Sequence, residues 1–506
     1  MNNDQTPTAP PPDHEISSRQ VVRATAWLAF AKLASYALAF AGTIALARIL
    51  VPEDFGVIAL SMAIMGIVAA FLDIPVTTAL IALSSPTEDE FNTAWTISII
   101  RSVIVALLLL AIAYPMAQMF SMPEVGPVIM VLALQMIIFG LRNPYFENFA
   151  RSMNFTWDVF AEITSKIVQV VVSVAIALIW KSYWAFVIGL LAGTLASMII
   201  TYFAARKMPA LSLRSPRRLL DYSIWLGLSM IVSRLTTESA NLIAGRRFGQ
   251  AALGQLHIGN KLSSEISYLF LVPIMRSLFS AFSRLSDDIN RFRAAYLRAQ
   301  SATVALALPV GLGLALVADP LIPFLLGPGW EDAVTIVQFY APCTGLLLAT
   351  GPIRSVAMSL SRTSLMLRRD VIALIVQVTC LLVGIWLYDF IGFLAGYVVS
   401  TVLATIINLF FLKTLLDISV LDQVRNFGRS LLSAAMMVGV VLAVRDVLNL
   451  PDTALGKMAT VALLSCAGAL VYAASHALLW RIFGCPEGIE QSVVNVAQKL
   501  KQKLAR

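Results

Sequence analysis

Charged residues are scarce in this chain. They make up 13% of the 506 residues, about half of the roughly 25% that is usual in soluble proteins. Apolar residues make up 58%, and the mean hydropathy is +0.81. One signal peptide or anchor cannot supply that much apolar sequence, because apolar stretches continue along the whole chain. The composition therefore excludes an ordinary soluble enzyme and predicts a protein embedded in a bilayer.

Cysteine and histidine are also rare, and the common catalytic motifs are missing. The four cysteines form no C-x-x-C pair, and the three histidines are scattered. The chain contains no G-x-x-x-x-G-K-[ST] phosphate loop, no H-E-x-x-H metal motif and no G-x-S-x-G nucleophile motif. We therefore expect no enzymatic activity, no catalytic residue, no bound metal and no cofactor.

Fourteen apolar stretches are long enough to cross a hydrocarbon core of about 30 Å as helices. The alternating ten-residue strands of an outer-membrane barrel are absent, so the predicted fold class is all-α and polytopic. The predicted spans are residues 24–48, 55–82, 92–114, 126–148, 159–180, 183–204, 219–245, 253–282, 297–318, 331–353, 369–388, 391–412, 429–448 and 457–480.

Lysine and arginine are distributed unequally between the two sides of these spans. With a cytoplasmic N-terminus, 25 of the 37 fall on cytoplasmic segments and 6 on outer loops. The positive-inside rule therefore predicts cytoplasmic N- and C-termini and an even number of spans. This distribution accounts for most of the net charge of +8, so no nucleic-acid partner is needed.

The first half of the chain repeats in the second at an offset of 198 residues. The offset pairs Trp27 with Trp225, Arg48 with Arg246, Gly56 with Gly254 and Pro75 with Pro273, among others. Six spans separate the copies, so both cross the membrane in the same direction, as in transporters whose two lobes surround a central site. A duplication without transport is the alternative.

Six cations fall inside predicted spans: Lys32, Arg101, Lys166, Arg234, Lys261 and Arg276. A charge at the centre of a spanning helix costs about 2.5 to 3.5 kcal/mol, so such residues usually face a cavity. We select Lys32, Arg234, Lys261 and Arg276 as a cationic, substrate-binding cavity that suits an anion such as a diphosphate. The alternative is local neutralisation at spacing i,i+4, which pairs Arg234 with Glu238 and Lys261 with Glu265.

Asp73 is the remaining costly charge. It could couple transport to a proton or sodium ion, pair with Lys32, or cap a helix near the Pro75 kink. Glu238 and Glu265 are candidates for the same coupling or charge-pairing roles. Arg101 and Lys166 receive little functional weight, because both lie near the cytoplasmic ends and Lys166 can pair with Glu162.

The predicted organisation has five parts. The polar, proline-rich N-terminus reads as a disordered cytoplasmic tail, and the C-terminus reads as a basic amphipathic helix on the cytoplasmic leaflet. Between them lie two six-helix lobes and two additional spans. The predicted limits are 1–20 for the tail, 21–208 and 209–415 for the lobes, 416–484 for the added spans and 485–506 for the amphipathic helix.

Several stretches carry a family resemblance. They include LARILVPEDFGVIALSMAIMGIVAAFLDIPVTTALI at 46–81, GLRNPYFENFARSMNF at 140–155 and GRRFGQAALGQLHIGNKLS at 245–263. As a set they resemble the polysaccharide transporter family, the Wzx-type oligosaccharide flippases of the MOP exporter superfamily. Pro75 departs from the family pattern, in which glycine is common at that position.

The resemblance implies a V-shaped pair of six-helix lobes with two added C-terminal helices. It also implies alternating access that moves an undecaprenyl-diphosphate-linked oligosaccharide across the inner membrane, for exopolysaccharide, capsule or O-antigen (lipopolysaccharide) biosynthesis. Candidate partners are membrane lipids, the polysaccharide polymerase and chain-length proteins. Two alternatives are a cation-coupled multidrug exporter of the same superfamily and a membrane polymerase or glycosyltransferase, which the short outer loops disfavour.

Overall fold

The structure is a computed structural model. It describes residues 18–72, 80, 86–152, 154–215, 224–283, 289–348, 350, 353–360, 362–448, 451 and 453–483. Within these ranges all regular structure is helical, which confirms the all-α prediction. Eight of the described helices are long and apolar enough to cross a membrane by length and composition. Helices suit this environment because they satisfy their backbone polar groups internally.

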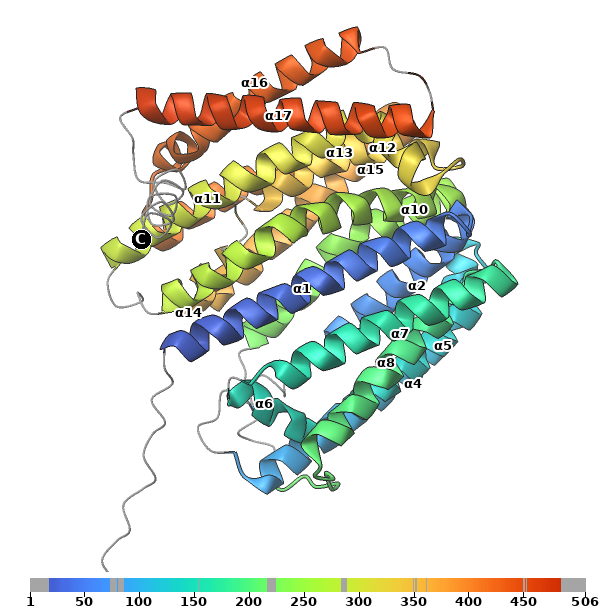
Figure 1. Cartoon of the computed structure of the whole chain (residues 1–506). Helices are drawn as coiled ribbons and strands as arrows, with labels where there is room; N and C mark the ends of the chain where they lie inside the picture. Colours follow the sequence, from blue (N-terminus) through green and yellow to red (C-terminus); the bar gives the residue numbers. More distant parts are fainter. Residues whose placement is uncertain are drawn as a thin grey trace, which may run out of the picture.

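The first half of the chain forms the N-lobe, which runs from α1 to α8. Its helices are α1 (Ser18–Ala47), α2 (Pro52–Phe71), α4 (Glu88–Phe120), α5 (Val125–Gly140), the 3₁₀ helix η1 (Pro144–Phe146), α6 (Glu147–Arg151), α7 (Thr156–Trp180) and α8 (Trp184–Ala205). In Figure 1, α1 lies in the middle of the molecule. It contacts α7 within the N-lobe and α10 in the second half of the chain.

The second half forms the C-lobe, α10 to α15, followed by two further helices. The elements are α10 (Ile224–Ser283), α11 (Ile289–Leu316), α12 (Ala318–Leu326), α13 (Glu331–Leu348), α14 (Ile353–Ser359), α15 (Thr363–Leu416), α16 (Val420–Val447) and α17 (Ala454–Ile482). Figure 1 shows α16 and α17 together along one edge. The residue limits of the predicted domains stay predictions.

Two of these elements are each a pair of helices joined at a sharp break. α10 breaks at Gly249, whose φ of +82° is a conformation that suits glycine. α15 breaks at Tyr388 and Asp389. With these breaks, all fourteen predicted spans coincide with described helices over most of their length.

One predicted span, 126–148, is not a single helix. α5 ends at Gly140, and the following helical residues are bent from it by 57°. Pro144 begins η1, and the Asn143 side chain accepts a hydrogen bond from the Tyr145 amide at 3.0 Å. Because proline has no amide hydrogen and disfavours a helical residue before it, α5 cannot continue through this point. The span predicted at 331–353 extends beyond its helix, because α13 ends at Leu348 and α14 begins at Ile353.

The 198-residue repeat corresponds to a contact between the lobes, where α2 meets the second helix of α10. A Cβ atom on Gly254 would lie 1.7 Å from the Pro52 carbonyl oxygen, and one on Gly56 would lie 2.0 Å from the Gln250 oxygen. Pro52 and Gln250 are equivalent in the repeat, as are Gly56 and Gly254. The two contacts therefore exchange when the copies exchange, which is the signature of a pseudo-twofold axis between the lobes.

The segment after α8 begins the connection between the lobes, and it lies along the first turns of α4. The amides of Ala210 and Ser212 donate to the Asn92 and Thr96 side chains, both at 2.9 Å. Lys207 pairs with Glu88, and this hydrogen-bonded partner raises the pKa of the exposed lysine. These contacts fix the first part of the inter-lobe connection to the N-lobe.

Candidate functional site

The candidate site lies where α1, α7, α8 and α10 meet. On α7 the polar residues Glu162, Lys166, Gln169 and Ser173 are spaced by three or four positions, so they share one face of the helix. The Lys32 Nζ of α1 lies 2.6 Å from Glu162 Oε1, and the two side chains are 34% and 29% exposed. Lys32 is therefore not an isolated cation, because its charge is paired within the N-lobe.

Lys166 is more central than the sequence suggested. Its predicted partner Glu162 is occupied by Lys32, and Lys166 Nζ instead donates to Gln169 Oε1 at 3.0 Å. That expectation was therefore wrong in its choice of partner. Lys166 also lies within electrostatic reach of Lys261 and Glu265 on α10. Spacing along one helix could not reveal this, because the neighbours belong to the other lobe.

Lys261 enters the same region from the C-lobe. Its ammonium lies 5.8 Å from the centre of the Phe186 ring on α8, within the range of a cation–π interaction. No ion pair joins the described side chains of Lys261 and Glu265, so the local pairing weighed for them does not form. Glu265 Oε2 is buried and has no hydrogen-bond partner. Both side chains therefore offer polar groups that a ligand or an ion could contact.

Arg234 follows the alternative prediction of local pairing. Its Nη2 lies 2.9 Å from Glu238 Oε1, and Glu238 is 9% exposed at its side chain. The second carboxylate oxygen of Glu238 accepts from Asn241 at 2.8 Å. The guanidinium also lies against Gly66 of α2, where a Cβ would be 2.3 Å from Nη2. Arg234 therefore sits at the contact between the lobes with its charge largely compensated.

The structure describes no side-chain position for two of the predicted site residues. Asp73 lies outside the described residues, and Arg276 lies on α10 with a side chain outside the described part. Among the residues that the structure describes, no group of three or more His, Cys, Asp or Glu is placed to hold a metal ion. The described charges thus form a mixed cluster of Lys32, Lys166, Lys261, Glu162 and Glu265.

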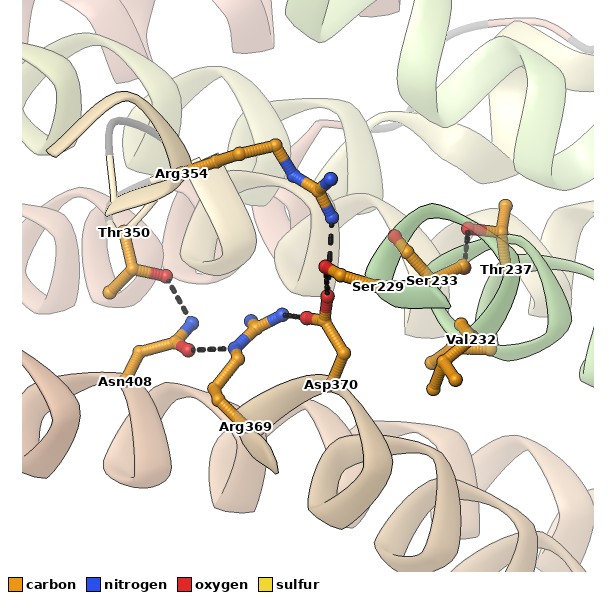
Figure 2. Close-up of polar contacts among 10 residues, drawn as sticks. Ser229, Val232, Ser233, Thr237, Thr350, Arg354, Arg369, Asp370 and Asn408 are labelled. Carbon is orange, nitrogen blue, oxygen red and sulfur yellow. Dashed lines mark hydrogen bonds and ion pairs between the residues drawn. The ribbon is translucent and has the colours of Figure 1, made fainter. Parts of the chain in front are cut away.

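A second buried polar network lies within the C-lobe (Figure 2), and sequence reasoning missed it. Asp370 of α15 is 1% exposed, and it lies 2.6 Å from Arg369 and 3.4 Å from Arg354. The Ser229 hydroxyl of α10 also donates to Asp370. Two arginines sharing one carboxylate leave a net positive charge, and they join α10, α14 and α15. Arg354 and Arg369 were counted only among the 25 cytoplasmic lysines and arginines that orient the chain.

The network continues toward the end of α15. Arg369 Nε donates to Asn408 Oδ1 at 2.7 Å, and Asn408 Nδ2 donates to Thr350 Oγ1 at 2.7 Å. Figure 2 shows these contacts as one chain of side chains between the helices. A hydrogen-bonded network of this kind favours one packing arrangement of the helices over others.

Comparisons with known proteins agree with this architecture. The succinoglycan biosynthesis transport protein ExoT of Rhizobium meliloti (strain 1021) is 24% identical over 334 residues, covering 66% of this chain and 68% of that protein. The lipopolysaccharide biosynthesis protein WzxC of Escherichia coli (strain K12) is 22% identical over 390 residues, covering 76% and 79%.

Solved structures share the fold. The lipid II flippase MurJ, in an inward closed conformation, superposes with a TM-score of 0.73 at 14% identity, covering 90% of this chain and 98% of that one. A multidrug resistance MATE family transporter of the MOP superfamily, facing inward, gives a TM-score of 0.60 at 16% identity, covering 76% and 94%. The family model described as polysaccharide biosynthesis protein matches residues 45–335. The chain therefore belongs to the polysaccharide biosynthesis protein family.

Proposed function

We propose that this chain is a flippase that moves a lipid-diphosphate-linked oligosaccharide across the inner membrane by alternating access. The observation that carries the proposal is the placement of Lys32, Lys166 and Lys261, from both lobes, at one meeting point of spanning helices. Intramembrane cations are costly and usually serve a polar cargo or a pathway. ExoT and WzxC, whose names refer to succinoglycan transport and lipopolysaccharide biosynthesis, support a saccharide cargo.

The chemistry of the cluster suits the headgroup of such a lipid. A diphosphate is attracted by ammonium and guanidinium groups, while the glutamates offer acceptors for sugar hydroxyls. The polyisoprenyl tail, for which we propose undecaprenol, remains in the bilayer while the headgroup passes between the lobes. We assign the headgroup contacts to Lys32, Arg234, Lys261 and Arg276, and the coupling or charge-pairing roles to Asp73, Glu238 and Glu265.

The proposed orientation places both termini in the cytoplasm, since that assignment puts most lysines and arginines on the cytoplasmic side. The α2–α10 glycine contact then lies on the periplasmic side and closes the site there. The polymerase and chain-length proteins would act on the cargo after it has crossed. In this scheme the chain makes and breaks no covalent bond and uses no cofactor.

The test is the fate of the lipid-linked repeat in a deletion strain. We expect complete repeat units to accumulate on the cytoplasmic leaflet, measured by their resistance to a periplasmic glycosidase in intact spheroplasts. Repeats already on the periplasmic leaflet would indicate a polymerase. Normal polymer export together with raised sensitivity to cationic drugs would instead indicate the drug exporter, and either result would refute the flippase.

A charge exchange separates cargo binding from ion pairing at Lys32. Lys32→Glu and Glu162→Lys should each impair export, because each leaves two like charges together. The double variant restores the pair with reversed direction. If Lys32 contacts the diphosphate, we expect export to stay at least about tenfold below wild type in the double variant; full rescue would show that Lys32 serves only as the partner of Glu162.

A further inference from the structure

Two helix ends from opposite lobes meet, and each is capped by a residue that follows the other. Arg48 directly follows α1 of the N-lobe, and Trp330 follows α12 of the C-lobe. Arg48 Nε donates to the Leu325 carbonyl oxygen at 2.7 Å, and its Nη2 donates to the Phe324 carbonyl oxygen at 2.6 Å. In return, Trp330 Nε1 donates to the Ala47 carbonyl oxygen at 3.0 Å. We call these three hydrogen bonds the reciprocal clasp.

Each bond of the clasp meets a group that its own helix leaves without a partner. The last carbonyl groups of an α-helix have no donor within the helix, and they form the negative end of the helix dipole. One planar guanidinium can donate to two such carbonyls at once, and it brings a positive charge to the helix end. The clasp therefore stabilises both helix ends only while the two lobes are in contact.

The loop that carries Trp330 is fixed from the C-lobe. Gly329 has a φ of +90°, a conformation that suits glycine. Gln255 of α10 donates to the Gly329 carbonyl oxygen at 2.7 Å and accepts from the Ala333 amide at 3.0 Å. Because Gln255 follows Gly254, the loop is held next to the glycine contact between the lobes.

An apolar cluster accompanies the clasp. Trp330 is 2% exposed, and the centre of its ring lies 5.3 Å from that of Phe55 on α2, with the two rings edge to face. Leu46 and Leu50 of the N-lobe lie in the same buried cluster as Leu326 of the C-lobe. Separating the lobes exposes these side chains, so the cluster and the clasp open together.

The clasp is present in only one half of the internal repeat. Arg246 is the repeat equivalent of Arg48, and it is exposed. Within the part of the chain that the structure describes, Arg246 forms no ion pair and no hydrogen bond to a helix end. The glycine contact is thus symmetric while the clasp is not, and Arg246 supplies a matched control of the same residue type.

We propose that Arg48 and Trp330 are positioning residues that hold the periplasmic side of the protein closed until the lobes part. The inference rests on the alternating access and the orientation of the proposed function, in which α1 and α12 end on the periplasmic side. Opening breaks all three bonds of the clasp. Because Arg48 is exposed, water replaces its bonds readily, and the clasp biases the equilibrium without preventing the open form.

Labelling of a buried position from the periplasmic side tests the clasp. The probe is a membrane-impermeant maleimide, applied to spheroplasts that carry Leu50→Cys in a background without the native cysteines; Leu50 is 4% exposed. We expect Arg48→Gln to raise the labelling rate at least about fivefold, because two charge-assisted hydrogen bonds are lost. Arg48→Lys keeps the charge and should give a smaller rise. Arg246→Gln should label at the parent rate, and an unchanged rate in Arg48→Gln or an equal rise in Arg246→Gln would overturn the proposal.

A distance measurement separates opening of the lobes from local fraying at Arg48. Double electron–electron resonance on the purified full-length protein uses labels at the exposed Lys181, between α7 and α8, and Val447 of α16, which packs on α11 of the C-lobe. We expect Arg48→Gln to add a population at longer distance and Arg246→Gln to keep the parent distribution. Faster labelling with unchanged distances would show a frayed loop and would overturn the clasp.

The two proposals can fail separately. The Lys181 to Val447 distances need neither cargo nor a known orientation, so they judge the clasp alone, whereas the deletion strain judges the flippase alone. If Arg48→Gln fails to fold, Arg48→Lys with the same two measurements decides the question, and parent values in both would overturn the clasp.

Discussion

The glycine contact between the lobes should set the balance between the two alternating conformations. In Gly254→Ala the new methyl group would lie 1.7 Å from the Pro52 carbonyl oxygen. Ordinary van der Waals contact begins near 3.4 Å, so α10 must move from α2 by roughly 1.7 Å. Inserting atoms into a packed contact costs about 1 to 3 kcal/mol. We expect the upper end, about 3 kcal/mol, because the obstacle is backbone and has no rotamer to change.

That energy is large enough to reverse the conformational equilibrium. Each 1.4 kcal/mol corresponds to a factor of ten, so about 3 kcal/mol lowers the population of the closed α2–α10 contact roughly 100-fold relative to the open form. Gly56→Ala should act similarly, since its Cβ would lie 2.0 Å from the Gln250 oxygen. The near equality of the two effects follows from the pseudo-twofold relation.

Double electron–electron resonance between two spin labels measures the change in distance between the lobes. Labels at the exposed positions Val51 and Ala251 flank the contact on opposite lobes, in a background with the native cysteines replaced. We expect a new, longer distance population in Gly254→Ala and Gly56→Ala. Gly439→Ala is the control, because nothing lies within 4 Å of its added Cβ. A wild-type distance distribution in both test variants would refute the reasoning.

Two further predictions concern buried contacts away from the glycines. Asp370→Asn leaves two partly exposed arginine charges without their buried carboxylate; we expect a cost near 3 kcal/mol, the low end for a broken buried pair, because water still reaches both arginines. Thermal unfolding checks it against the exposed neighbour Arg368→Gln, and equal unfolding temperatures would contradict it. Trp330→Phe removes the 3.0 Å hydrogen bond to the Ala47 carbonyl, worth about 1 kcal/mol. The same spin-label pair should then show a smaller opening than Gly254→Ala, and a larger one would be inconsistent with this estimate.

Local sequence patterns predicted the parts of the molecule that depend on near neighbours. The all-α fold class was predicted correctly because a helix in lipid satisfies its backbone within itself. The pairing of Arg234 with Glu238 could be anticipated for the same reason, since residues four apart share a helix face. The bend after α5 was missed, although Asn143 and Pro144 carried a signal for it.

Long-range partners had no such signal. Glu162 pairs with Lys32 from 130 residues away, so no spacing rule could select it over the local alternative with Lys166. The network around Asp370 could not be predicted from the sequence either. Its members come from four segments of the C-lobe, and no one of these segments shows a pattern that points to the others. Which side chains meet depends on how each helix is rotated against its neighbours.

The sequence by itself determined the membrane class, the all-α fold class, the charge asymmetry and the internal repeat. These are properties of composition and of contacts within one helix. Only the tertiary structure decided that Lys32 is paired, that Lys166 and Lys261 lie within electrostatic reach of each other, and that Gly56 and Gly254 bring the lobes into contact. The physical reason is that helix packing is set by small residues at crossing points and by buried polar partners, which act between helices distant in the chain.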